Sequence, residues 1–114
     1  MLSQDDVRRL ALALPEAVEQ DHHGMPSFRV NKKVFATLRT ATPKVMLVFD
    51  PEDQHHLLEG RPDALERVPG TWGLRGCTLI SYEKVDEAQL AAMMHMAWAR
   101  LAPKRLAKAF VQGA

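Results

Sequence analysis

The sequence predicts an α+β fold, a two-layer sandwich in which N-terminal and C-terminal helices pack on one face of an antiparallel meander sheet. The clearest helical spacings of apolar residues stand near the two ends of the chain, and four short β-like runs follow one another between residues 17 and 49. The connections between these runs are too short for crossover helices, so consecutive strands should pair antiparallel. One face of the sheet should be buried under the helices and the other left open.

The first helix is predicted to begin after Ser3, a good N-cap residue. Asp6 stands at the capping-box position, and apolar residues recur at helical spacing until Pro15. Turn residues such as Gly24 and Pro43 then separate the predicted strands. These strands are residues 17–22, 27–30, 34–39 and 45–49.

The middle of the chain predicts shorter elements. Asp50 and Pro51 are typical of the N-cap and first position of a helix, and Gly60 supplies its C-cap. A further helical fragment is expected between Pro62 and Pro69. The last two strand pieces are expected at residues 72–74 and 77–82.

The closing helix is opened by a second capping box, formed by Asp86 and Gln89. Its apolar residues form one stripe at helical spacing, until Pro103 kinks or restarts the helix. Three residues extend the stripe in a final helical piece: Leu106, Ala107 and Phe110.

The composition is that of one globular domain spanning residues 1–114. With 46% hydrophobic and 25% charged residues, a disordered or fibrous chain is excluded. No apolar run exceeds five residues, far below the roughly 20 that span a bilayer, so we expect no membrane partner. The first ten residues have no signal-like apolar core, which predicts a cytoplasmic protein.

The net charge of +1 conceals a segregation of charge along the chain. Residues 22–49 contain five Lys or Arg and no Asp or Glu, and after Glu87 four basic residues follow without an acidic one. A basic face is the usual electrostatic footprint of a surface that binds a polyanion. Solubility and helix C-termini favour the same cations, so both interpretations stay open.

Strand register decides which side chains reach the open face, where function is expected. A two-residue loop would pair Val30 with Lys33 and mix apolar with charged residues on one face. We expect instead a three-residue loop at residues 31–33, which pairs Val30 with Val34. This register exposes the Phe35 ring beside cations, where the ring can stack on a base or sugar. Burial of Phe35 in the core is the alternative. The open face then carries Arg29, Lys33, Phe35, Thr37 and Arg39.

Catalysis and metal binding are not expected. Four of the five histidines form two adjacent pairs, and adjacent histidines point apart in a strand or a helix, so neither pair chelates one ion. The single cysteine, Cys77, excludes an internal disulfide and lies in an apolar run typical of a buried structural thiol. Trp72, between glycines, is interpreted as a packing anchor or the lining of a small groove. We therefore expect no enzyme and no cofactor.

Several segments together resemble one known family. They are LALPE (12–16), HGMPSFRVNKKVFATL (23–38), VMLVFDPED (45–53), the 72–76 segment and the closing helix ending in APKRLA. In these segments the chain is similar to the YjbR-like family, also called MmcQ/YjbR. The resemblance implies a fold like that of the bacterial frataxin homologue CyaY, and DNA binding by a double-wing arrangement of hairpins. It implies no catalytic residues, and Asn31 and Lys32 stand where many members have a glycine-rich turn.

We therefore expect a bacterial DNA-binding protein that contacts phosphates with weak sequence preference. A module that binds an acidic protein partner, without nucleic acid, is the alternative. Frataxin-like iron handling and a small-ligand role stay open as well. The residues assigned to the nucleic-acid surface are Arg29, Lys32, Lys33, Phe35, Arg39 and Lys44, joined by Lys104, Arg105 and Lys108.

Overall fold

The computed structural model describes the backbone of residues 1–113 and the side chains of residues 1–108, so the expected packing of Phe110 lies outside the described residues. Within them, six antiparallel strands form one sheet in the order β1-β2-β3-β4-β6-β5. The strands are β1 (Val18–His22), β2 (Met25–Val30), β3 (Lys33–Leu38), β4 (Lys44–Val48), β5 (Leu65–Arg67) and β6 (Cys77–Ser81). The helices are α1 (Gln4–Leu12), α2 (Pro51–Gly60), α3 (Thr71–Leu74), α4 (Glu87–Leu101) and α5 (Lys104–Gly113), with a 3-10 turn, η1 (Tyr82–Lys84).

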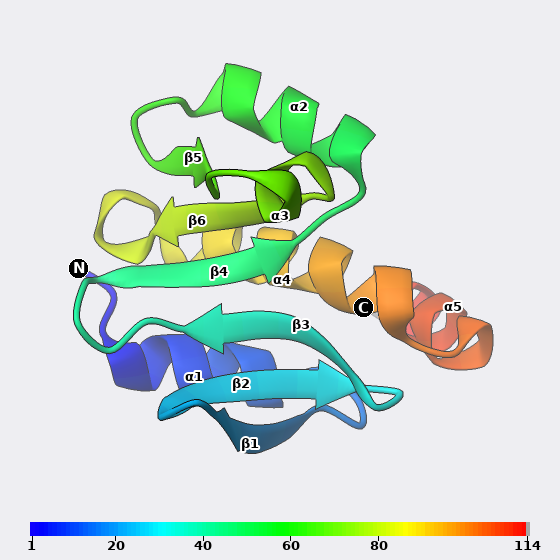
Figure 1. Cartoon of the computed structure of the whole chain (residues 1–114). Helices are drawn as coiled ribbons and strands as arrows, with labels where there is room; N and C mark the ends of the chain where they lie inside the picture. The colour runs from blue at the N-terminus through cyan, green and yellow to red at the C-terminus, as the bar shows by residue number, and fades with distance from the viewer. Residues whose placement is uncertain (114) are drawn as a thin grey trace.

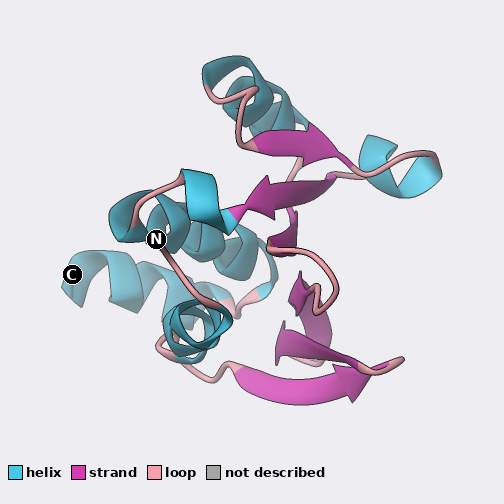
Figure 2. Cartoon of the chain, turned by 90° about the vertical axis from the view of Figure 1, so that its left-hand side faces the viewer, coloured by secondary structure: helices cyan, strands magenta, loops and turns pink. Residues whose placement is uncertain are grey.

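The main layer of helices covers one face of the sheet. Helix α4 contacts β3 and β4, α1 contacts β3, and Figures 1 and 2 show α1, α4 and α5 on the same side of the sheet. The short helix α3 lies on the opposite side, beside β6 (Figure 2). The predicted two-layer α+β architecture is confirmed. The meander holds from β1 to β4, after which β5 occupies the sheet edge outside β6.

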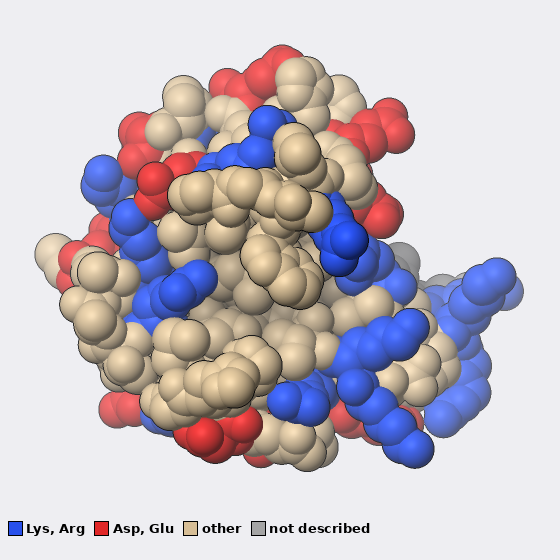
Figure 3. Space-filling view, in the orientation of Figure 1, with Lys and Arg blue, Asp and Glu red and all other residues tan. Residues whose placement is uncertain are grey.

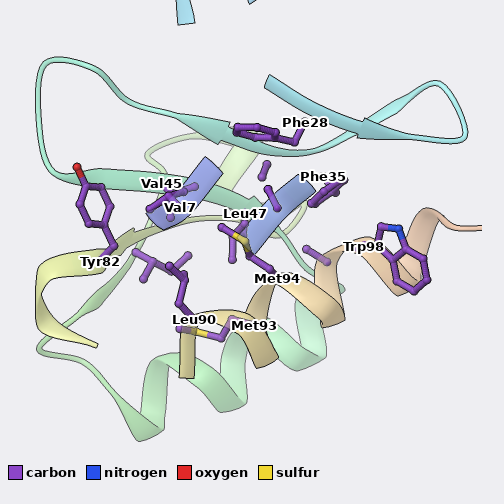
Figure 4. Close-up of a cluster of buried hydrophobic side chains, with 14 of the residues drawn as sticks. Val7, Phe28, Phe35, Val45, Leu47, Tyr82, Leu90, Met93, Met94 and Trp98 are labelled. Carbon is purple, nitrogen blue, oxygen red and sulfur yellow. The ribbon is translucent and has the colours of Figure 1, made fainter. Parts of the chain in front are cut away.

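The core lies between the sheet and the helix layer. Figure 4 shows Phe28 and Phe35 of the sheet facing the side chains of Met94 and Trp98 from α4. Both phenylalanines and Trp98 are fully buried. The indole Nε1 of Trp98 donates a hydrogen bond to the Pro15 carbonyl oxygen at 2.9 Å, so the aromatic body fills the core while its polar atom stays paired.

Both predicted capping boxes are present. The Ser3 hydroxyl accepts from the backbone N–H of Asp6, whose carboxylate accepts from the backbone N–H of Ser3 at 2.8 Å. Asp86 and Gln89 make the equivalent pair at the start of α4. These pairs satisfy backbone donors that a helix leaves free at its N-terminus.

Two of the expected short elements are wrong. Residues 62–69 contain a strand, β5, because pairing of Leu65 with Ile80 satisfies the outer edge of β6 and buries Leu65 in the core. Residues 72–74 form helix α3 instead of a strand. Gly70 has φ of 81°, which turns the chain away from the sheet, and in the resulting helical turn Gly73 packs so closely against the Val68 carbonyl that no larger residue fits there.

The β2–β3 hairpin adopts a register different from the one we expected. Asn31 and Lys32 have φ of 53° and 66°, which makes a two-residue turn and pairs Val30 with Lys33. The register then shifts, because Arg29 pairs with Val34 whereas Phe28 pairs with Ala36. Phe35 is the extra residue of this β-bulge and is turned into the core with no exposed surface. The prediction of an exposed Phe35 is therefore wrong.

Candidate functional site

The open face of the sheet is hollowed at its centre. The hollow has a volume of about 540 Å³, and Figure 3 shows a depression of uncharged atoms with basic groups at several places around it. Its floor is built by side chains of β3, β4 and β6 that alternate onto this face. The floor residues are Val34, Thr37, Met46, Val48 and Cys77.

Four cations line this depression, which we call the basic hollow. Lys33 begins β3 and Arg39 follows its end, Arg75 follows α3, and Arg100 comes from the last turn of α4. Among the described residues that line the hollow, none is Asp or Glu. Positive groups around a low-dielectric floor focus the potential and attract anions.

Two of the four cations, Arg100 and Arg39, differ in whether their Nε has a partner. Arg100 reaches Asp50 with 3.5 Å between Nε and the carboxylate oxygen. Arg39 differs, because its Nε is buried and has no hydrogen-bond partner among the described residues. An unpaired buried donor of this kind is costly unless a ligand or water accepts from it.

Trp72 stands at the rim of the basic hollow. The residue is 65% exposed, although tryptophan usually buries most of its surface. The Arg75 guanidinium lies 5.6 Å from the indole centroid, within the range of a cation–π contact. The rim therefore combines an accessible aromatic ring with a cation that lies against it.

Close backbone packing fixes the segment that carries Trp72. A Cβ at Gly73 would lie 1.8 Å from the Val68 carbonyl oxygen, and one at Gly76 would lie 1.8 Å from that of Phe49. Gln54 of α2 is also buried against this segment, with its amide nitrogen 3.0 Å from the Gly73 carbonyl oxygen. The exposed indole is thus mounted on a rigid support.

The basic residues predicted from the sequence are divided among several places. Lys33 and Arg39 line the basic hollow, while Arg29 and Lys32 line a neighbouring depression of about 410 Å³ at the same hairpin. Lys44 is ion-paired with Glu66 and does not line the hollow. The α5 cations Lys104, Arg105 and Lys108 belong to the helix layer, where Arg105 lies 3.5 Å from Glu16.

Sequence reasoning missed two of the cations, Arg75 and Arg100. Nothing in the local pattern marks Arg100, which reaches the open side from the end of a helix on the other face. The sequence Trp-Gly-Leu-Arg-Gly at 72–76 was the available signal, because glycines flanking an aromatic and a basic residue mark a tightly turned segment. The groove-lining interpretation of Trp72 agrees with its position.

The thiol of Cys77 lies at the floor of the hollow and is buried, as expected. Burial raises the pKa of this thiol, and the nearby charges of Arg100 and Arg75 oppose that rise only in part. The thiol form of Cys77 is therefore favoured, which is unfavourable for nucleophilic chemistry.

The described part of the chain shows neither a metal-binding cluster nor a membrane-spanning helix. No group of three or more His, Cys, Asp or Glu side chains within it is placed to hold a metal ion. Within the same residues, each helix is too short or too polar to cross a bilayer.

These features define an α+β sandwich with a basic, apolar-floored hollow on the uncovered face of its sheet. The chain belongs to the YjbR family, because the family model described as YjbR matches residues 12–100. It is also similar in fold to the Deinococcus radiodurans protein DR2400, whose crystal structure is described with the domain DUF419. That likeness has a TM-score of 0.73 at 17% identity and covers 99% of this chain and 88% of the other. No curated protein matches the chain.

Proposed function

We propose that this protein binds nucleic acid, and specifically DNA, through the open face of its sheet. The observation that supports the proposal is the convergence of Lys33, Arg39, Arg75 and Arg100 on one hollow whose described lining contains no carboxylate. Arg29 and Lys32 add two cations at the adjacent hairpin, in a depression that Glu16 also lines. Phosphate oxygens are the ligands that such separated cations fit, because a nucleic-acid backbone presents negative charges at regular intervals.

Binding of this kind depends strongly on salt and weakly on sequence. Each phosphate neutralised releases condensed counterions, so the logarithm of the binding constant falls with the logarithm of salt by about 0.9 per contact for duplex DNA. The basic hollow offers few directional groups that would read base edges, since its floor is mostly aliphatic. We therefore expect backbone contacts with little discrimination among sequences.

The test is fluorescence anisotropy of labelled oligonucleotides, titrated at several salt concentrations. The variant Lys32→Glu/Lys33→Glu reverses two charges on the hairpin, and Lys104→Glu/Lys108→Glu makes the same change of charge on α5. We expect the hairpin pair to lose at least tenfold in affinity and the α5 pair to lose much less. Equal losses in the two variants, or no binding by the wild type at low salt, would contradict the proposal.

An acidic protein is the second candidate partner, and two neighbouring apolar side chains favour it. Trp72 and Leu74 of α3 are 65% and 68% exposed beside the cations, as in surfaces that bind other proteins. Affinity purification with and without nuclease separates the candidates. A partner retained after nuclease treatment, together with no oligonucleotide binding, would favour the protein partner.

A further inference from the structure

We infer that the basic hollow receives an unpaired nucleotide of a single strand, with its base on the apolar floor beside Trp72 and its phosphates on the rim cations. This inference rests on the proposed nucleic-acid function and names the substrate class of the same site. It predicts a preference for single-stranded over duplex nucleic acid. Three features of the hollow lead to it: its shape, the exposed indole and the unpaired donor of Arg39.

The shape of the hollow suits a small planar group. Its volume of about 540 Å³ falls within the 300–1,000 Å³ typical of sites for small organic ligands. The aliphatic side chains of Val34, Met46 and Val48 form the floor, and the cations stand around it. A duplex keeps its base faces stacked inside and presents phosphates outside, so it would bridge the rim and leave this floor uncovered. An unstacked base offers an apolar face that matches the floor.

The exposed indole of Trp72 supplies the stacking surface that single-strand binding requires. Aromatic rings bind successive bases in single-stranded complexes because every base has a π face. Trp72 is 65% exposed, and the Arg75 guanidinium lies over the ring at 5.6 Å from its centroid. The contacts of Gly73, Gly76 and Gln54 fix the backbone that carries the ring, so little backbone ordering is needed when a base arrives.

The unpaired donor of Arg39 indicates that a polar group completes the site. Its Nε is buried without a partner among the described residues, as is the Nε of Arg29 in the neighbouring depression, and the Arg39 side chain lines the hollow. A phosphate oxygen or the exocyclic oxygen of a base would accept from this donor. Guanidinium groups suit either acceptor, because they present several N–H groups in a fixed plane.

The experiment compares labelled single strands and duplexes of equal length and matched sequence by anisotropy, with the wild type, Trp72→Ala and Trp72→Phe. We expect the wild type to bind the single strand about tenfold or more tightly than the duplex. Trp72→Ala should lose about tenfold in single-strand affinity with little change for the duplex, and Trp72→Phe should recover much of the loss. Because the indole is exposed, the variants should keep the wild-type unfolding midpoint.

Intrinsic fluorescence supplies a second readout. Trp98, the other tryptophan, is fully buried, so quenching by an added single strand should come from Trp72 and vanish in Trp72→Ala. Duplex binding as tight as single-strand binding, or an equal effect of Trp72→Ala on both, would overturn the inference and leave the proposed function standing. Affinity for a free mononucleotide equal to that for the strand would overturn it as well. Absence of binding to either oligonucleotide at low salt would remove the proposed function itself.

Discussion

Gln54 and Gly73 are joined by a buried hydrogen bond, in which the Gln54 Nε2 donates to the Gly73 carbonyl oxygen at 3.0 Å. The same nitrogen lies 3.2 Å from the Cys77 carbonyl oxygen and 2.9 Å from the Thr78 Oγ1. The Gln54 Oε1 accepts from the Arg67 Nε at 3.2 Å. One amide side chain from α2 therefore ties together β5, β6 and the segment that holds Trp72 at the basic hollow.

Replacement of Gln54 by leucine should destabilise the protein by about 1–3 kcal/mol, because buried acceptors and the Arg67 donor then lose a partner. Urea unfolding followed by far-UV circular dichroism measures the change. Gln20→Ala is the matched control, since this glutamine is exposed on β1, and we expect an effect within about 0.5 kcal/mol. A Gln54 variant as stable as the control would contradict the role given to this amide.

Phe35 is expected to contribute to stability by packing in the core and not to contact a ligand. Phe35→Ala should cost about 3–5 kcal/mol in unfolding free energy, whereas Phe35→Leu should cost roughly 1–1.5 kcal/mol, because leucine refills most of the space. Phe35→Leu should retain oligonucleotide affinity within about twofold. A large loss of affinity in a folded Phe35→Leu variant would show that the ring contributes to binding after all.

The glycines around α3 should respond to alanine very differently from Gly60. Gly76 has φ of 110° and a Cβ there would meet the Phe49 carbonyl oxygen at 1.8 Å, so Gly76→Ala should cost at least about 2 kcal/mol. A Cβ at Gly60, the last residue of α2, meets no atom within 4 Å, and Gly60→Ala should gain about 0.5 kcal/mol. Thermal unfolding of the two variants and the wild type tests both predictions: a lower midpoint for Gly76→Ala and a higher one for Gly60→Ala.

Lys32 holds a left-handed backbone conformation that suits glycine better. Lys32→Gly should therefore stabilise the hairpin by about 1 kcal/mol, because a side chain at φ of 66° is strained. The same change removes one cation, so it should reduce the salt slope of duplex binding by about one unit. Thermal unfolding measures the gain in stability, and anisotropy titrations at several salt concentrations measure the smaller slope. An unchanged slope would exclude Lys32 from the phosphate contacts.

Lowering the pH should decrease the free energy of unfolding, in part because Asp6 becomes protonated. Hydrogen bonds from Ser3, with a further contribution from Arg9, lower the pKa of this carboxyl below its ordinary 3.8. Stabilisation from a lowered pKa is present above pH 3.8 and is lost as the pH falls through the folded-state pKa. Asp6→Asn should be less stable than the wild type at pH 7 and should lose less stability between pH 4 and 2. Urea unfolding midpoints of both proteins, measured across that pH range, test this prediction. The same pH dependence in the wild type and in Asp6→Asn would contradict it.

Much of the fold follows from local chemistry in the sequence. Ser3 with Asp6, and Asp86 with Gln89, predicted both capped helices, and the turn residues predicted β1 to β4 and β6 within a few residues. The failures lie where long-range pairing overrides local pattern. Leu65 joins a strand because β6 has an edge to satisfy, and the bulge at Phe35 depends on the turn beyond it and on the space available in the core.

Residue spacing and residue type along the chain were enough to predict the fold class, the family and the presence of a basic hairpin. The folded arrangement was needed to show which cations share a site. It joined Arg75 and Arg100 to Lys33 and Arg39, placed Lys44 against Glu66, and buried Phe35. Local pattern does not predict this grouping, because the hollow forms only where separate elements pack together. Its members come from a helix, a loop and two ends of one strand, and no spacing along the chain records that they meet.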